Sequence, residues 1–205
     1  LAFSPYVYGQ DNMFDVTAKQ IRARMSMLAP HASWIRTFSC TRGNEMSPGI
    51  AKELGLNSMV GVWIDDDLER NEIEMQNGIE IAKRGEAGIL AIGNEVLLRE
   101  EMSEDELIAY IERAKAEVDV PVGYVDAYFL FENHPRVAAA CDVLLVLAVN
   151  GDRGVHAQED LARRRLLHLL RRLPPAPGPR AAAAPPAAPP PPRRAVRSTG
   201  AEACR

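Results

Sequence analysis

A carboxylate at the end of a buried strand is the feature of this sequence best suited to chemistry. Residues 89–92 read Ile-Leu-Ala-Ile, and Gly93, Asn94 and Glu95 follow directly. A strand end on a rigid sheet fixes a carboxylate closely enough for proton transfer, and the Asn94 amide can donate to a ligand hydroxyl. A helix-capping Asn and a solvated Glu would have the same sequence, so the pair alone does not separate an active site from a surface loop.

Aromatic and acidic residues recur after other apolar runs. Those at the ends of predicted strands are Tyr6, Tyr8, Trp63, Asp65, Asp126 and Tyr128. The ring of Trp63 suits the apolar face of a sugar, although an ordinary core tryptophan fits this position equally well. We expect Tyr6, Tyr8 and Tyr128 to be further substrate contacts. The run of Asp at 65–67 is interpreted as a solvated loop before a helix rather than a metal site.

Repeated β-α units are predicted to position these side chains. Apolar, β-branched runs alternate with segments of helical period up to about residue 146, which is typical of a parallel sheet. The predicted strands are Ala2–Tyr8, Trp34–Ser39, Ser58–Ile64, Gly88–Ile92, Val120–Val125 and Asp142–Val146.

Helix signals stand between these runs. Thr17 is a suitable cap for one helix, and Ser47-Pro48 begins another with Pro at its first turn. A third is predicted over residues 68–84. Ser103 and Glu106 form a capping box that begins a fourth, and a shorter helix is expected after Pro135.

Two α/β architectures fit this order: a doubly wound open sheet and an incomplete eight-stranded (β/α)₈ barrel. No glycine-rich phosphate-binding motif follows any strand, which disfavours nucleotide-binding sheets. The polar and aromatic residues at strand ends favour the barrel, since barrel active sites lie at that end. Six strands cannot close an eight-stranded barrel, so we expect exposed sheet edges and a tendency to associate.

The charge distribution excludes some partners. Residues 1–150 carry 24 acidic and 13 basic residues, whereas 151–205 carry 4 and 11. The front part would repel nucleic acid and anionic membranes, whereas neutral sugars remain suitable partners. Three cysteines and four histidines show no disulfide or metal-ligand spacing, so no metal or other cofactor is expected. The sequence leaves the cellular location and the oligomeric state open.

The region from 147 to 205 has a different character. Ten of the 15 prolines lie within residues 174–192, among Ala, Gly and Arg. Such a composition predicts a disordered tail that is not part of the 1–146 domain. GC-rich DNA translated in the wrong frame would explain it; a genuine Arg-rich tail that binds a partner is the alternative hypothesis.

Several segments together resemble glycoside hydrolase family 17, in its bacterial β-1,3-glucanase-like form. They are Ser4-Pro5-Tyr6, Ile35-Arg36-Thr37-Phe38, residues 50–56, residues 60–64, Glu69-Arg70-Asn71-Glu72, residues 107–111 and, most specifically, Ile-Gly-Asn-Glu-Val-Leu-Leu-Arg at 92–99. The resemblance covers about residues 1–146. It implies a (β/α)₈ barrel that hydrolyses or transfers β-1,3-glucan with retention and without a metal. It places the acid/base role on Glu95 and a sugar-binding role on Asn94.

The resemblance also implies a second carboxylate, the nucleophile, from a Glu-x-Gly-Trp segment of the seventh strand. This sequence has no such segment. We therefore expect a chain truncated before its nucleophile and inactive alone. A non-catalytic glucan-binding module, or an interaction protein acting through the Arg/Pro-rich tail, are the alternatives.

Overall fold

The computed structural model describes residues 1–147. Their strands are β1 (Trp34–Arg36), β2 (Asn57–Val62), β3 (Ile89–Asn94), β4 (Val122–Ala127) and β5 (Val143–Leu147). The helices are α1 (Ala18–Leu28), α2 (Ser47–Glu53), α3 (Leu68–Lys83), α4 (Glu104–Glu117), α5 (Tyr128–Asn133) and α6 (Pro135–Ala140), with short 3₁₀ turns η1 (Ala29–His31) and η2 (Asn44–Met46). The predicted 147–205 tail lies almost wholly outside the described residues.

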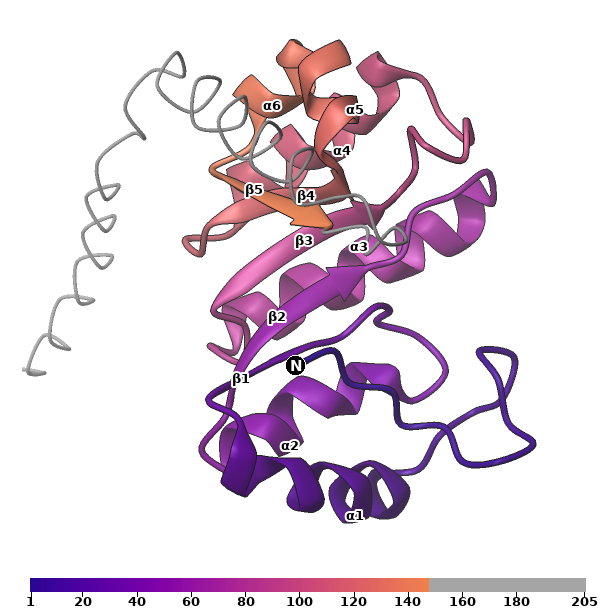
Figure 1. Ribbon diagram of the computed structural model, residues 1–205, viewed down its shortest axis with the longest axis vertical. Helices are drawn as coiled ribbons and strands as arrows, with labels where there is room; N and C mark the ends of the chain where they lie inside the picture. The colour runs from indigo at the N-terminus through magenta and orange to yellow at the C-terminus, as the bar shows by residue number, and fades with distance from the viewer. Residues whose placement is uncertain (148–205) are drawn as a thin grey trace, which may run out of the picture.

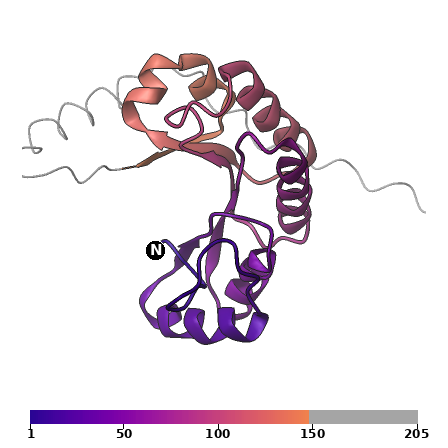
Figure 2. The same ribbon diagram turned by 90° about the vertical axis from the view of Figure 1, so that its right-hand side faces the viewer.

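The five strands form one parallel sheet in chain order, β1-β2-β3-β4-β5. A doubly wound sheet reverses its order at a switch point, whereas a barrel adds strands in sequence. Figure 1 shows the strands side by side, and Figure 2 shows the sheet curled into an open arc with helices along its outer side. The order and the curl therefore favour the barrel type of α/β sheet.

The prediction of a first strand over Ala2–Tyr8 is wrong. Ala2 makes only an isolated parallel bridge to Arg36, and the Phe3 N–H donates to the Arg36 carbonyl oxygen at 2.8 Å. Pro5 has no N–H with which to continue the ladder, and β1 itself ends at Arg36. Five of the six expected strands are thus present, and Tyr6 and Tyr8 lie on irregular chain.

The predicted helix starts are confirmed. Thr17 caps α1 by accepting a hydrogen bond from the Gln20 N–H, and α2 begins at Ser47. Ser103 and Glu106 form the expected capping box of α4, and α6 begins at Pro135. None of the helices within residues 1–147 is long and apolar enough to cross a membrane.

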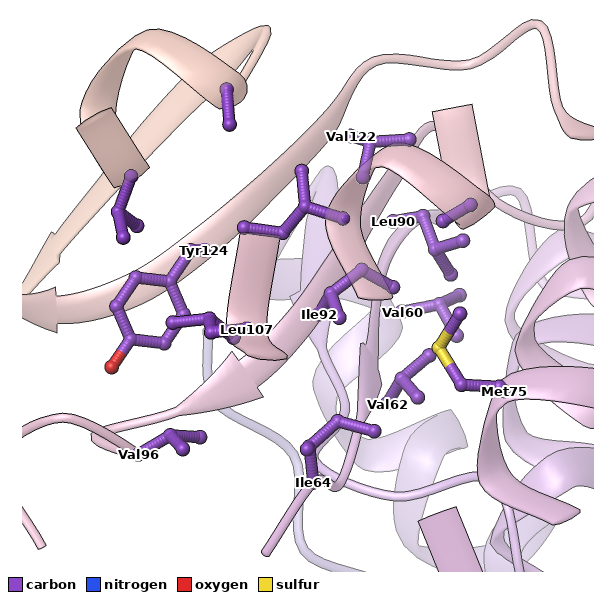
Figure 3. Packing of buried hydrophobic residues seen from close by; sticks show 14 of the residues in the cluster. Val60, Val62, Ile64, Met75, Leu90, Ile92, Val96, Leu107, Val122 and Tyr124 are labelled. Atoms are coloured by element: carbon purple, nitrogen blue, oxygen red, sulfur yellow. The ribbon is translucent and has the colours of Figure 1, made fainter. Parts of the chain in front are cut away.

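Two hydrophobic clusters fasten the helices to the sheet. The larger joins β2, β3 and β4 to α3, α4, α5 and α6, and Figure 3 shows Val60, Val62, Leu90, Ile92 and Met75 packed within it. A smaller cluster, which includes Ile21, Met25 and Ile35, joins α1 and α2 to β1. Burial of these side chains fixes the strands, and with them the residues at the strand ends.

Candidate active site

The end of β3 is shaped by a bulge. Ala91 pairs with Gly123 and Asn94 with Val125, so three steps along β3 match two along β4. Gly93 takes a positive φ of 81° within the bulge, and a Cβ there would stand 2.8 Å from Cγ2 of Val96. Bulges redirect side chains and are common beside active sites. Glycine at 93 thus permits the turn that presents Asn94 and Glu95.

Glu95 follows the bulge in a strained backbone conformation. Its φ is 55°, a left-handed value that costs a residue other than glycine about 1 kcal/mol or more. Its N–H donates to the Val125 carbonyl oxygen at 2.8 Å, and its carbonyl oxygen accepts from the Arg99 N–H at 2.9 Å. These bonds hold the half-buried Glu95 in a conformation that it would not adopt alone.

Arg36 sets the orientation of Asn94. The Arg36 guanidinium donates to Oδ1 of Asn94, so the Asn94 amide nitrogen faces the neighbouring carboxylate and lies 3.2 Å from Oε2 of Glu95. The guanidinium also lies over the Phe38 ring, 4.5 Å from its centroid. Burial lowers the pKa of Arg36, while the negative charge of Glu95 acts in the opposite direction.

Arg99 binds the other side of the same strand end. It donates to the Asn94 carbonyl oxygen and forms a two-pronged ion pair with Glu101 at 2.7 and 2.6 Å. Hydrogen bonding to Glu101 raises the pKa of Arg99, against the effect of burial. Its guanidinium carbon lies 4.9 Å from the centroid of the Trp63 ring, a cation–π contact. Arg99 therefore links the ends of β2 and β3.

Tyr124 and Asp126 support the loop that follows Glu95. The buried Tyr124 hydroxyl donates to Oδ2 of Asp126 and accepts from the Leu97 N–H at 2.9 Å. In Figure 3 this hydroxyl points toward the side on which Val96 lies. Burial raises the pKa of Tyr124 well above its ordinary value. Burial also raises the pKa of Asp126, and the negative charge of Glu95 adds to the increase.

The raised pKa of Asp126 predicts a pH effect on stability. An aspartate with a raised folded-state pKa stabilises the fold fully below its ordinary value of about 3.9, and this contribution is lost as pH rises through the folded-state pKa. We expect the wild-type chain to lose stability relative to Asp126→Asn as pH rises from 3.5 to 8. Urea unfolding of both chains across this range measures it. A constant difference between them would show that Asp126 is not the titrating group.

A cavity of about 290 Å³ opens beside this strand end, at the ends of β1 and β2. Two predicted contacts line it. They are Tyr6 and Trp63. The Tyr6 hydroxyl accepts a hydrogen bond from Nδ2 of Asn44 at 3.2 Å, and Nε1 of Trp63 donates to Oδ2 of Asp65 at 2.8 Å. Glu95 and Asn94 are not among its lining residues.

The remaining predicted contacts lie apart from this cavity. Tyr8 is fully exposed on the N-terminal irregular segment. Tyr128 is half-buried at the start of α5, where its ring meets Phe129 edge to face at 5.7 Å. The structure thus places Tyr6 and Trp63 together, and Asn94 and Glu95 together, but adds neither Tyr8 nor Tyr128 to either pair.

The acidic run 65–67 has structural partners. Asp65 accepts from Trp63, from Arg70 and from the Asp67 N–H, while Asp67 caps α3 by accepting from the Arg70 N–H at 3.1 Å. No group of three His, Cys, Asp or Glu within residues 1–147 is arranged to hold a metal. This run therefore forms the loop before α3, with Asp67 as its cap as the sequence indicated, whereas Asp65 is buried and not solvated.

Comparison with known proteins identifies the family. Residues 1–149 match the model of the BtgE/BtgC glycoside hydrolase domain. The chain belongs to this family. No curated protein matches it.

Comparison with solved structures relates this chain to glycoside hydrolase family 17. A family 17 β-1,3-glucanosyltransferase from Rhizomucor miehei matches with a TM-score of 0.60 and 25% identity, over 69% of this chain and 55% of that one. An active-site mutant of the R. miehei enzyme in complex with laminaritriose matches with a TM-score of 0.66 and 22% identity, over 82% and 66%. This chain spans less than two thirds of either structure. The resemblance to family 17 is thereby confirmed.

The sequence did not point to several residues that build this candidate site. Glu74 is the largest omission: it is 1% exposed and accepts four hydrogen bonds, from Ser39, Thr41, the Cys40 N–H and the Trp63 N–H. A signal existed, because Asn71, Glu74 and Gly78 share the buried face of α3 at helical spacing. Arg36 and Arg99 stand within segments that carry the family resemblance, but their spacing indicated no role in the site, since arginines at strand ends are ordinarily solvated.

Proposed function

We propose that this chain carries the acid/base half of a retaining glycosidase or transglycosylase site for β-1,3-glucan. Glu95 is the proton donor to the departing sugar oxygen, and Asn94 binds the hydroxyl beside the reacting carbon. The observation that carries the proposal is the oriented Asn94–Glu95 pair on the bulged end of β3. Membership of a glycoside hydrolase domain family, and a similar structure in complex with laminaritriose, support the choice of substrate.

Retaining chemistry divides the work between two carboxylates about 5–5.5 Å apart. The nucleophile attacks the anomeric carbon while Glu95 protonates the leaving oxygen, which breaks the glycosidic bond and forms a glycosyl-enzyme. Glu95, now ionised, then takes a proton from water or from the hydroxyl of an acceptor sugar, which displaces the nucleophile. Water gives hydrolysis, and an acceptor sugar gives transfer.

The Glu95 carboxylate lies near two positively charged side chains. Arg36 and Arg99 place positive charge near the Glu95 carboxylate, as their electrostatic interactions with it indicate. No Glu-x-Gly-Trp segment occurs in this sequence. We therefore propose that the chain by itself forms no glycosyl-enzyme and turns over no natural glucan.

Binding without turnover is the expected result for the isolated chain. Calorimetry should detect binding of laminaritriose, and a reducing-sugar assay should find the sugar intact. Asn94→Ala should weaken binding about tenfold, the effect of one lost hydrogen bond of about 1–1.5 kcal/mol. Asn133→Ala, an exposed amide at the end of α5, is the matched control and should bind normally.

Two results would count against the proposal. A wild-type chain that binds no laminaritriose lacks the proposed substrate site. A chain that hydrolyses laminaritriose, with the activity lost in Glu95→Gln, already contains a nucleophile, and the expected inactivity would be wrong.

A further inference from the structure

A single helical turn follows Glu95. The Arg99 N–H donates to the Glu95 carbonyl oxygen at 2.9 Å. The Glu101 N–H donates to the Val96 carbonyl oxygen at 3.1 Å, and Glu100 ends the turn with a left-handed φ of 55°, as is common after a helix. Glu95 therefore occupies the position of a helix cap, because its backbone is not helical and its carbonyl oxygen accepts the first bond of the turn.

Such a turn leaves its first N–H groups without partners inside it. The side chain at the cap position ordinarily accepts from the second or third of them, which here belong to Leu97 and Leu98. Within the part of the chain that the structure describes, the Glu95 carboxylate does not do so, and it instead accepts from Nδ2 of Asn94 at 3.2 Å. Because Leu97 is buried, its N–H needs an acceptor from elsewhere in the protein.

Two side chains of β4 supply the missing acceptors. The Tyr124 hydroxyl accepts from the Leu97 N–H at 2.9 Å. The Asp126 carboxylate is hydrogen-bonded to the backbone of Leu98, and it also accepts from the Tyr124 hydroxyl, so the two acceptors are joined to each other. Both side chains are buried, and the Tyr124 ring packs edge to face on Phe131 at 5.7 Å. The core of the domain therefore fixes a cap for this turn from a neighbouring strand.

We propose that Tyr124 and Asp126 are positioning residues that cap this turn in place of Glu95 and thereby leave the Glu95 carboxylate free to transfer a proton. A Glu95 side chain that capped its own turn would be bound to the backbone and withdrawn from a ligand. The effect on proton transfer rests on the proposed function, whereas the capping does not, so each has its own test.

A crystal structure of Tyr124→Phe tests the capping. Phenylalanine keeps the ring that packs on Phe131, so the chain should fold, but the Leu97 N–H loses its acceptor. A carboxylate oxygen of Glu95 should then lie about 2.7–3.2 Å from the Leu97 nitrogen, the range of an N–H···O hydrogen bond. A Glu95 carboxylate that stays beside Asn94 in this variant would overturn the proposal.

Glycosyl transfer from α-laminaribiosyl fluoride tests the effect on proton transfer. An acceptor hydroxyl attacks the anomeric carbon of this donor, fluoride leaves, and Glu95 takes the hydroxyl proton. Tyr124→Phe should lower the maximal rate about tenfold to a hundredfold, because a misplaced base is a poor catalyst, and should change the Michaelis constant less than about twofold. Tyr110→Phe, a half-buried tyrosine on α4, is the matched control and should transfer at the wild-type rate.

The outcomes separate the positioning role from the proposed function. An unchanged maximal rate in Tyr124→Phe, while Glu95→Gln is inactive, would overturn the positioning role and leave the role of Glu95 standing. A raised Michaelis constant in Tyr124→Phe at an unchanged maximal rate would also overturn it, because the tyrosine would then act on sugar binding. If Glu95→Gln transfers as fast as the wild-type chain, and the carboxylate caps the turn in Tyr124→Phe, the capping stands and the proposed function is wrong.

Discussion

Replacing Glu95 by glutamine is expected to abolish glycosyl transfer from an activated donor that needs no enzymatic nucleophile. With α-laminaribiosyl fluoride, an acceptor hydroxyl attacks the anomeric carbon directly, the carbon–fluorine bond breaks, and Glu95 takes the hydroxyl proton. General-base catalysis contributes about 10²–10⁴-fold. The wild-type chain should therefore release fluoride and form a lengthened oligosaccharide at least a hundred times faster than Glu95→Gln.

The loop that bears Glu95 contains its own control. Glu100 has the same φ of 55° and is exposed, and no contact places it in the site. Glu100→Gln should transfer at the wild-type rate, as measured by a fluoride electrode and by chromatography of the products. Equal rates in all three chains would mean that Glu95 is not the base. If the wild-type chain binds laminaritriose but transfers nothing from the fluoride donor, the result favours the glucan-binding module instead.

Gly93→Ala is expected to destabilise the fold strongly. Alanine would keep a left-handed φ at a cost of about 1–2 kcal/mol, and its Cβ would stand 2.8 Å from Val96 and 3.4 Å from the Tyr124 ring. Overpacking adds about 1–3 kcal/mol. The two together predict a loss of about 2–5 kcal/mol in the free energy of unfolding, measured in urea, and weaker laminaritriose binding.

Gly55 separates the two causes. It has a similar φ of 77°, but a Cβ there would meet nothing within 4 Å. Gly55→Ala should therefore lose only about 1 kcal/mol and should bind sugar normally. If both alanine variants were equally stable, the tight packing of the bulge against Val96 and Tyr124 would not hold the end of β3.

Sequence patterns predicted the β-α order because each strand and helix has its own local signal. Capping residues such as Thr17 and Ser103 marked helix starts, and apolar runs marked five strands. The strand prediction failed where strand formation depends on pairing with a neighbouring segment. Residues 2–8 have a strand-like composition, but Pro5 prevents the pairing that would make them one. Helix α5 was likewise not predicted, because its six residues are too few to show a helical period.

Only the part of the candidate site that is local in sequence was predictable. Asn94 and Glu95 are adjacent in sequence, so a single motif identified both. Their supports come from distant positions: Arg36 is 58 residues from Asn94, and Tyr124 is 27 residues from Leu97. Single-sequence reasoning cannot pair such residues, because no periodicity connects them. The bulge at Gly93 was equally hidden, since it exists only in the register between β3 and β4.

A crystal structure of the Glu95→Gln chain in complex with laminaritriose tests the central assignment most directly. We expect an ordered sugar across the ends of β1, β2 and β3, with the side-chain amide at position 95 about 2.6–3.2 Å from a glycosidic oxygen. A laminaritriose that is ordered elsewhere on the chain, or that passes this strand end without contact to position 95, would contradict it.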